Sequence, residues 1–166
     1  GRILSLLAFL LVCAAIAQIL RHMDCGARAL MCAVTIFAAA LLIGSDYVAM
    51  ADPQLLGHAV QLSGLVLLLR GRHLAAAALF TVSLFVKHNL VALPVAALFW
   101  LLLRNRHAGW RGFLCALAVM GLGLALFDWF YGFSLLPRLS SARLVSLANM
   151  QLAISRLWWA ALPLGL

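Results

Sequence analysis

Long apolar runs, each followed by a short charged segment, dominate this sequence. Six such runs cover residues 3–20, 29–44, 53–69, 74–86, 90–103 and 112–127. The runs are continuous, whereas the strands of a membrane β-barrel alternate apolar and polar residues with a period of two. Hydrophobic residues make up 67% of the chain and charged residues 10%, against about half and about a quarter in a typical soluble domain. The sequence therefore predicts an all-α membrane protein, because one small core cannot bury so much apolar surface.

The predicted architecture is a polytopic bundle of about six transmembrane helices plus the start of a seventh at residue 158. The runs are shorter than the roughly 20 residues that a hydrocarbon core of about 30 Å requires, a mismatch that snorkelling arginines or local bilayer thinning can absorb. Residues 129–157 mix aromatic side chains, leucines and arginines, a composition typical of an external amphipathic segment. Because the sequence begins at Gly1 and ends as another apolar run begins, residues 1–166 are expected to be one transmembrane domain within a longer protein.

Positive charge alternates between successive loops. The loops after the first, third and fifth runs hold seven of the twelve Lys and Arg residues, whereas the loops after the second and fourth hold only Lys87. Asp46, Asp52 and Asp128 fall on the same side as Lys87. The positive-inside rule then predicts that the arginine loops are cytoplasmic and that these four residues are external. The basic residues are dispersed between apolar runs and form no single patch, so we interpret them as topology signals and expect no nucleic-acid partner.

Two carboxylates, Asp46 and Asp52, lie in the short loop between the second and third runs. Asp52 precedes Pro53, the pattern of a helix N-cap followed by proline at the first helical position. At the external membrane boundary the same carboxylate would also be available to a metal, a sugar hydroxyl or a cation. Capping and a functional role therefore both stay open for Asp52, and Asp46 is the weaker candidate, a solvated loop acid.

A polar stripe follows on the third run. Gln54, His58 and Gln61 recur at i, i+4 and i+7, so they share one face of a helix. Gly57 and Gly64 repeat at seven on a neighbouring face that suits close helix contact. The stripe is expected to face protein, because unpaired polar groups are costly in lipid. Hydrogen bonding between helices is the favoured interpretation, and the wall of a cavity open to the outside is the alternative.

Three consecutive polar residues, Lys87, His88 and Asn89, interrupt an otherwise apolar stretch. Each carries a hydrogen-bond donor, and the next helix begins directly after them, where free N–H groups and the helix dipole favour anions. Pro94 would leave carbonyls free near the start of that helix. The pattern predicts a phosphate-binding group with Asp52 as its partner on the same face, and a snorkelling turn lysine is the alternative.

No metal site is predicted from the sequence. The cysteines lack CxxC spacing and are expected to be small packing residues, and the remaining histidines stand beside arginines and are expected to be solvated. These residues are Cys13, Cys25, Cys32 and Cys115, and His22, His73 and His107.

Two short motifs resemble the membrane core of C-type glycosyltransferases, the multi-pass enzymes similar to protein mannosyltransferases and aminoarabinose transferases. The motifs are Met50-Ala51-Asp52-Pro53-Gln54-Leu55-Leu56 and, about thirty residues later, Phe85-Val86-Lys87-His88-Asn89 before a helix that contains Leu-Pro. The similarity covers roughly residues 10 to 105. Bacterial members often read TDP or NDP at the first motif and TK at the second, followed by small or polar residues. The KHN of this chain departs from the commoner small residues, which leaves the substrate open.

The resemblance implies an enzyme of the bacterial inner membrane that moves a sugar from a polyprenyl-phosphate donor to an acceptor hydroxyl on the external face. In this family the main catalytic acid lies in an upstream external loop, so it is expected outside this chain, and a divalent cation assists some members. Asp52 would be a supporting carboxylate, with Asp46 a weaker candidate. Lys87 and His88 would contact the donor phosphate, with Gln54 and Asn89 beside them. The implied partners are membrane lipid, a lipid-linked sugar and a lipid, glycan or protein acceptor.

A fragment of a secondary transporter or permease is the alternative function. The stripe from Gln54 to Gln61 and the interrupted run at Lys87 would fit a midplane site built from broken helices. Against it, the polar groups cluster near one face, and no internal repeat is visible. A purely structural membrane subunit would explain the hydrophobicity, but it gives no reason for the grouped acids and the KHN segment.

Overall fold

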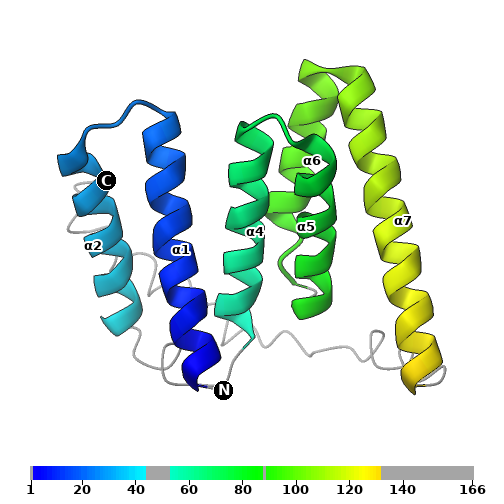
Figure 1. Cartoon of the computed structure of the whole chain (residues 1–166), viewed down its shortest axis with the longest axis horizontal. Coiled ribbons are helices and arrows are strands. Elements are labelled where there is room, and N and C mark those ends of the chain that lie inside the picture. Colours follow the sequence, from blue (N-terminus) through cyan, green and yellow to red (C-terminus); the bar gives the residue numbers. More distant parts are fainter. Residues whose placement is uncertain (1, 44–52, 88, 132–166) are drawn as a thin grey trace, which may run out of the picture. The chain divides into compact units, whose positions relative to one another are not determined.

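The computed structural model describes residues 2–43, 53–87 and 89–131, and all regular structure in these ranges is α-helical (Figure 1). The all-α prediction is confirmed for this part of the chain. Contacts divide the chain into two units, residues 1–126 and 127–166, and the packing below is that of the first. The helices are α1 (Arg2–His22), α2 (Ala27–Ile43), α4 (Gln54–Leu69), α5 (His73–Val86), α6 (Ala92–Arg104) and α7 (Arg106–Tyr131).

Two of the described helices are long and apolar enough to cross a membrane. They cover Ile3–His22 in α1 and Arg106–Phe130 in α7, while the other described helices are apolar but shorter. Large apolar side chains stand exposed on the outer faces, among them Ile3 at 78%, Leu103 at 73% and Trp110 at 58%. Soluble proteins rarely expose contiguous apolar surface on this scale. The exposed faces therefore favour a membrane setting.

The last described helix, α7, differs from the apolar run that predicted it. The run begins at residue 112, whereas α7 begins at Arg106, so most of the expected arginine loop is helical. Asn105 explains the difference, because its Oδ1 accepts a hydrogen bond from the Ala108 N–H over 3.1 Å, the geometry of an N-cap. At its other end α7 includes Trp129 and Phe130, which the sequence assigned to an external segment. Residues 132–157 of that segment lie outside the described residues.

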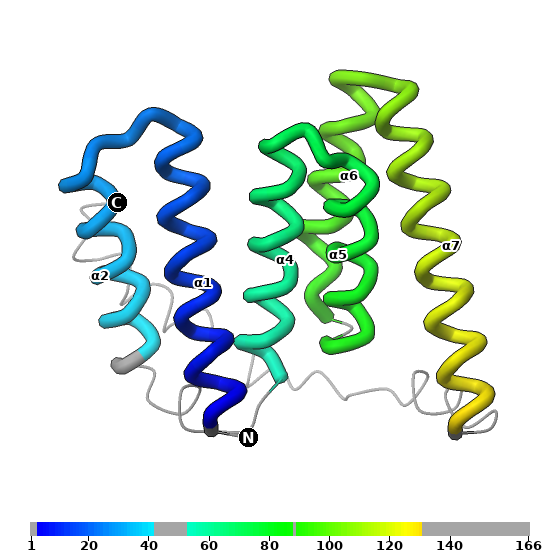
Figure 2. Tube along the Cα trace, in the orientation of Figure 1, coloured from blue at the N-terminus to red at the C-terminus, as the bar shows by residue number. Residues whose placement is uncertain are grey.

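Helix α4 lies at the centre of the packing. It contacts α1 on one side and α5 on the other, while α2 packs on α1 and α6 packs on α5 and α4 (Figure 2). Two clusters of buried side chains hold these contacts. One joins α4, α5 and α6 through Leu68, Ala76, Phe80, Ala97 and Leu101. The other joins α1 and α4 through Ala8, Val12, Leu55 and Ala59.

The connections α1–α2, α4–α5 and α6–α7 share one end of the first unit (Figure 1). Arg21 and Arg70 line one cavity at this end, and His22 and Arg104 line a neighbouring one. The opposite end carries the start of α4 and the turn after α5. The arginine segments thus gather away from Lys87, as the alternation of charge along the sequence requires.

Gly64 sets the close packing of α4 on α5. A Cβ at Gly64 would lie 3.0 Å from two ring carbons of Phe80 and 3.4 Å from the carbonyl oxygen of Ala76. Phe80 is only 1% exposed, so its ring has little room to retreat. By contrast, a Cβ at Gly121 in α7 would meet no atom within 4 Å.

Substituting Gly64→Leu is expected to lower the free energy of unfolding by about 1–3 kcal/mol, the usual cost of overpacking a core. Gly121→Leu is the matched control, since it adds the same side chain to a helix at an open position. Unfolding of both variants in detergent, followed by circular dichroism, measures the difference. Equal destabilisation by the two substitutions would contradict the role of Gly64.

Candidate functional site

Gln54 and Lys87, both predicted site residues, meet at the end of the α4–α5 pair. The Lys87 Nζ donates a hydrogen bond to Gln54 Oε1 over 3.0 Å, in a partly buried position. Lys87 ends α5 with an extended backbone (φ −152°, ψ 107°), and its N–H still bonds the Ser83 carbonyl. Its own carbonyl accepts from the Leu90 N–H over 3.2 Å. Lys87 and Leu90 are therefore held together between α5 and α6, and the lysine side chain is directed towards α4.

Gly57 lets this turn approach α4. A Cβ at Gly57 would lie 2.6 Å from Leu90 Cδ1 and 3.7 Å from Lys87 Cβ. Gly57 and Gly64 both contact the α5 side of the bundle, Gly57 at the turn and Gly64 at Phe80. The two glycines therefore serve close approach, as their spacing of seven indicated.

Gln61 forms the second polar contact between α4 and the turn. Its Nε2 donates to the backbone carbonyl of Leu90, and its side chain is only 3% exposed. Leu90 precedes Val91, the N-cap of α6, and the first helical hydrogen bond of α6 goes to the Val91 carbonyl. The Leu90 carbonyl therefore lies outside the ladder of α6, and Gln61 supplies its donor. Pro94 stands in the first turn of α6, where its missing N–H breaks no helical hydrogen bond, so the expectation that Pro94 leaves a carbonyl free is not met.

A cavity of about 500 Å³ opens beside the polar stripe. Its wall is largely apolar, and its polar residues are Gln54, His58 and Gln61, the three members of the stripe. The apolar residues come from α1, α2, α4 and α6: Val12, Ile16, Phe37, Leu41, Leu55, Leu62 and Leu93. The amides of the stripe thus bond to groups on neighbouring segments, and the same stripe lines a cavity; its predicted opening to the outside stays a prediction.

His58 and the apolar wall were not among the predicted site residues. His58 is half-buried and follows Gln54 by one helical turn, so the i+4 spacing already placed it on the face that lines the cavity. Phe37 and Leu93 also line the cavity, but nothing in the sequence distinguishes them from the other apolar residues of their runs.

The remaining predicted site residues divide into two groups. Asp46, Asp52 and His88 lie outside the described residues. The N-cap of α4 is Pro53 and the first helical residue is Gln54, so the prediction of an Asp52 cap with Pro53 at the first helical position is wrong. Asn89 is described and exposed. Helix α6 begins close by, with Val91 as its N-cap and no side-chain hydrogen bond to the cap. Within the described ranges, no three His, Cys, Asp or Glu side chains gather to hold a metal ion.

Replacing Gln61 by leucine is expected to cost about 1–3 kcal/mol of stability, because the Leu90 carbonyl would lose its partner in a partly buried position. The matched control is Ser63→Ala, since the Ser63 hydroxyl bonds the Ala59 carbonyl of its own helix over 2.7 Å and that carbonyl keeps its helical partner. Unfolding in detergent and amide exchange at Leu90 measure the effect. An unchanged exchange rate at Leu90 in Gln61→Leu would show that Gln61 does not hold the turn.

No protein-family model, curated protein or solved structure matches this chain. The similarity of its two motifs to C-type glycosyltransferases consequently stays a prediction from the sequence. The chemistry open to the chain is set by its own residues: an apolar cavity lined by Gln54, His58 and Gln61, with Lys87 bonded to Gln54.

Proposed function

We propose that this chain is part of an integral membrane glycosyltransferase that moves a sugar from a polyprenyl-phosphate donor to an acceptor hydroxyl. One observation carries the proposal: Lys87, bonded to Gln54 over 3.0 Å, stands where Gln54 lines an apolar cavity of about 500 Å³. A polyprenyl phosphate has an anionic group joined to a branched hydrocarbon chain. A cation next to an apolar cavity complements both parts of such a molecule.

The size and lining of the cavity support a lipid-linked ligand. Ligand pockets are typically about 300–1,000 Å³ and mostly apolar, with a few polar groups that fix orientation. Phe37, Leu41 and Leu93 would contact the first isoprene units, and Gln54 and His58 would face the polar end. The first turn of α6, directly after the Lys87 turn, adds backbone N–H groups that favour an anion.

Lys87 would act on the leaving group. In the transfer, the acceptor oxygen forms a bond to the anomeric carbon of the sugar while the bond from that carbon to the phosphate oxygen breaks. The bonding electron pair leaves with the polyprenyl phosphate, and the acceptor proton passes to a general base. A cation next to the phosphate stabilises the charge that develops there. Asp52, two residues before Gln54 in the sequence, is proposed as a supporting carboxylate.

The proposed setting is the bacterial inner membrane, with a multi-pass bundle whose arginine segments are cytoplasmic. Two helices long enough to span, the exposed apolar faces and the gathering of arginines at one end support it. Lys87 and Gln54 lie at the other end, so the site would open on the external side, where a lipid-linked sugar donor is accessible.

A transporter fragment is the second candidate, because the cavity itself favours it. Gln54, His58 and Gln61 line a cavity between α1, α2, α4 and α6, and a polar small molecule would find three hydrogen-bonding side chains there. The lysine at the end of α5, away from the middle of the helices, argues for a site near one surface. Uptake by the reconstituted full-length protein would favour transport, and turnover of a lipid-linked sugar would favour transfer.

In the full-length protein, Lys87→Ala is expected to reduce transfer from a polyprenyl-phosphate sugar by about 100-fold or more, the usual cost of removing a group that stabilises developing charge. Lys87→Arg keeps the charge and is expected to retain part of the activity. Arg111→Ala, an exposed residue of α7, is the control. Unchanged turnover in both Lys87→Ala and Asp52→Ala would remove these residues from the mechanism.

Cysteine accessibility tests the topology. In a full-length protein without its native cysteines, single cysteines at positions 46, 52 and 88 are expected to react with an impermeant reagent from outside. Cysteines at positions 71 and 105, next to the arginines, are expected to react only after permeabilisation, because positively charged loops stay in the cytoplasm. Labelling of both groups from the same side would overturn the proposed topology and the external site.

A further inference from the structure

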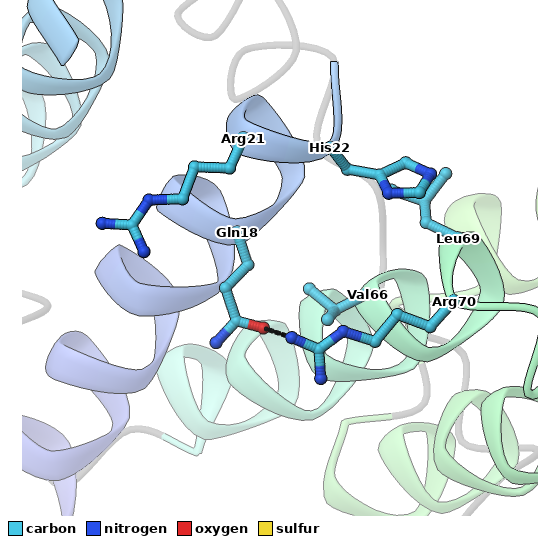
Figure 3. A pocket seen from close by; sticks show the side chains of 6 residues that line it. All are labelled: Gln18, Arg21, His22, Val66, Leu69 and Arg70. Carbon is cyan, nitrogen blue, oxygen red and sulfur yellow. Dashed lines mark hydrogen bonds between the residues drawn. The ribbon is translucent and has the colours of Figure 1, made fainter. Parts of the chain in front are cut away.

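A cationic cleft lies at the arginine end of the α1–α4 pair (Figure 3). Its volume is about 270 Å³, and it is lined by Gln18, Arg21, His22, Val66, Leu69 and Arg70. The guanidinium of Arg70 donates to Gln18 Oε1 over 2.9 Å, as the dashed line in Figure 3 shows. This bond orients Arg70 across the cleft from α4 to α1 and leaves its other N–H groups available for an anion.

A second cavity adjoins this cleft. It has a volume of about 320 Å³ and shares His22 and Leu69 with the first. Arg104 lines it, with its guanidinium carbon 5.3 Å from the centre of the Trp100 ring. His73 also lines it, and its buried Nδ1 has no hydrogen-bond partner among the residues that the structure describes. The cationic and donor groups of α1, α4, α5 and α6 therefore converge on two neighbouring hollows.

Negative charge is scarce at this end. Asp24 is the acidic residue of the connections described there, against arginines at positions 21, 28, 70, 72, 104, 106 and 111. The positive-inside rule explains why arginines occur in these connections. It does not explain why Arg21 and Arg70 line one cleft, or why the Gln18 amide holds Arg70 in place. A bound anion would relieve the repulsion among the like charges.

An apolar groove leads away from the cleft between the same two helices. It has a volume of about 230 Å³ and shares Gln18 and Val66 with the cleft. The rest of its lining is mostly apolar or small: Leu11, Ala14, Ala15, Ser63 and Leu67. Leu11 is 53% exposed, so the groove is open along the outer face of α1. A cationic cleft continuous with an open apolar groove fits an anionic headgroup that carries a hydrocarbon chain.

We propose that this end of the chain binds an anionic phospholipid, with its phosphate in the cleft and one acyl chain along the α1–α4 groove. Arg70 would hold a phosphate oxygen through a charge-assisted hydrogen bond. Arg21, which lines the same cleft but is directed away from Arg70 in Figure 3, would add its positive charge, and its guanidinium would have to turn to reach the phosphate. Basic pockets between membrane helices bind anionic headgroups in this manner. The site rests on the membrane setting proposed above but does not depend on glycosyl transfer, since it lies at the opposite end of α4 from Lys87.

The test compares lipid retention by the purified full-length protein, using native mass spectrometry after incubation with phosphatidylglycerol or phosphatidylcholine. The protein is expected to retain phosphatidylglycerol preferentially. The Arg21→Ala/Arg70→Ala variant is expected to bind it about tenfold to hundredfold more weakly, as the loss of hydrogen bonds to charged groups implies. Arg111→Ala removes a charge outside the three cavities and is expected to bind normally. Equal retention by the double variant would overturn the proposal.

Two further variants separate the lipid from a free phosphate. Ser63→Leu would fill the groove without changing the cleft, so it is expected to weaken phosphatidylglycerol binding and to leave any binding of inorganic phosphate unaltered. Arg70→Gln, with circular dichroism to confirm its helix content, replaces the double variant if that variant does not fold. If inorganic phosphate alone saturates the cleft and Ser63→Leu retains phosphatidylglycerol, the site holds free phosphate and the lipid assignment fails.

Lys87→Ala keeps this test distinct from the proposed enzyme activity. Its substitution lies at the other end of α4, so phosphatidylglycerol retention is expected to equal that of the unmodified protein even where transfer is lost. If the protein turns over no lipid-linked sugar but retains phosphatidylglycerol through Arg21 and Arg70, the glycosyltransferase proposal is wrong and the lipid-binding proposal stands. Loss of retention in Lys87→Ala would overturn the separation of the two sites.

Discussion

Polar groups in this apolar chain need hydrogen-bond partners, and this need holds the turn after α5 and helix α1 against α4. The hydroxyl groups of Ser63, Thr81 and Ser83 find their partners locally, because each donates to a carbonyl of its own helix. The two glutamine amides at the site reach further. Gln61 donates to the Leu90 carbonyl, which lies before the first helical hydrogen bond of α6. The hydrogen bonds of Gln54 and Gln61 hold the turn after α5 against α4. The hydroxyl bonds do not link one helix to another.

The hydrogen bonds between α4 and the turn after α5 require that the turn lies close to α4. A side chain at Gly57 would meet Leu90 at 2.6 Å, so the turn could not lie where Gln61 reaches its carbonyl. Gln54 in turn gives the half-buried Lys87 a partner, which offsets part of the cost of removing its charge from water. Arg70, the C-cap of the same helix, bonds Gln18 of α1. Helix α4 therefore joins its neighbours by a polar contact at each end and by apolar packing between them.

Much of the helical structure could be predicted, because continuous apolar runs and the charges between them mark helices and connections directly. The start of α7 was missed because an Asn105 cap has no effect on hydropathy and was hidden among arginines. The shared location of Gln54 and Lys87 followed from loop parity, but their hydrogen bond depends on Gly57 and on the turn geometry. The apolar wall of the cavity could not be predicted. Phe37 and Leu93 line it only because the packed helices leave a gap beside them, and their sequence context resembles that of the other apolar residues.

The position of Lys87 connects the charge pattern to the proposed chemistry. Arginines mark the other end of the bundle, so a lysine at this end runs against the bias that would fix the topology, and its half-buried setting adds a desolvation cost. The positive-inside bias alone therefore does not account for a lysine at this position. Under the proposed function, a phosphate on a lipid chain would give this charge a role, because the cavity beside Gln54 would receive the chain while Lys87 would meet the anion.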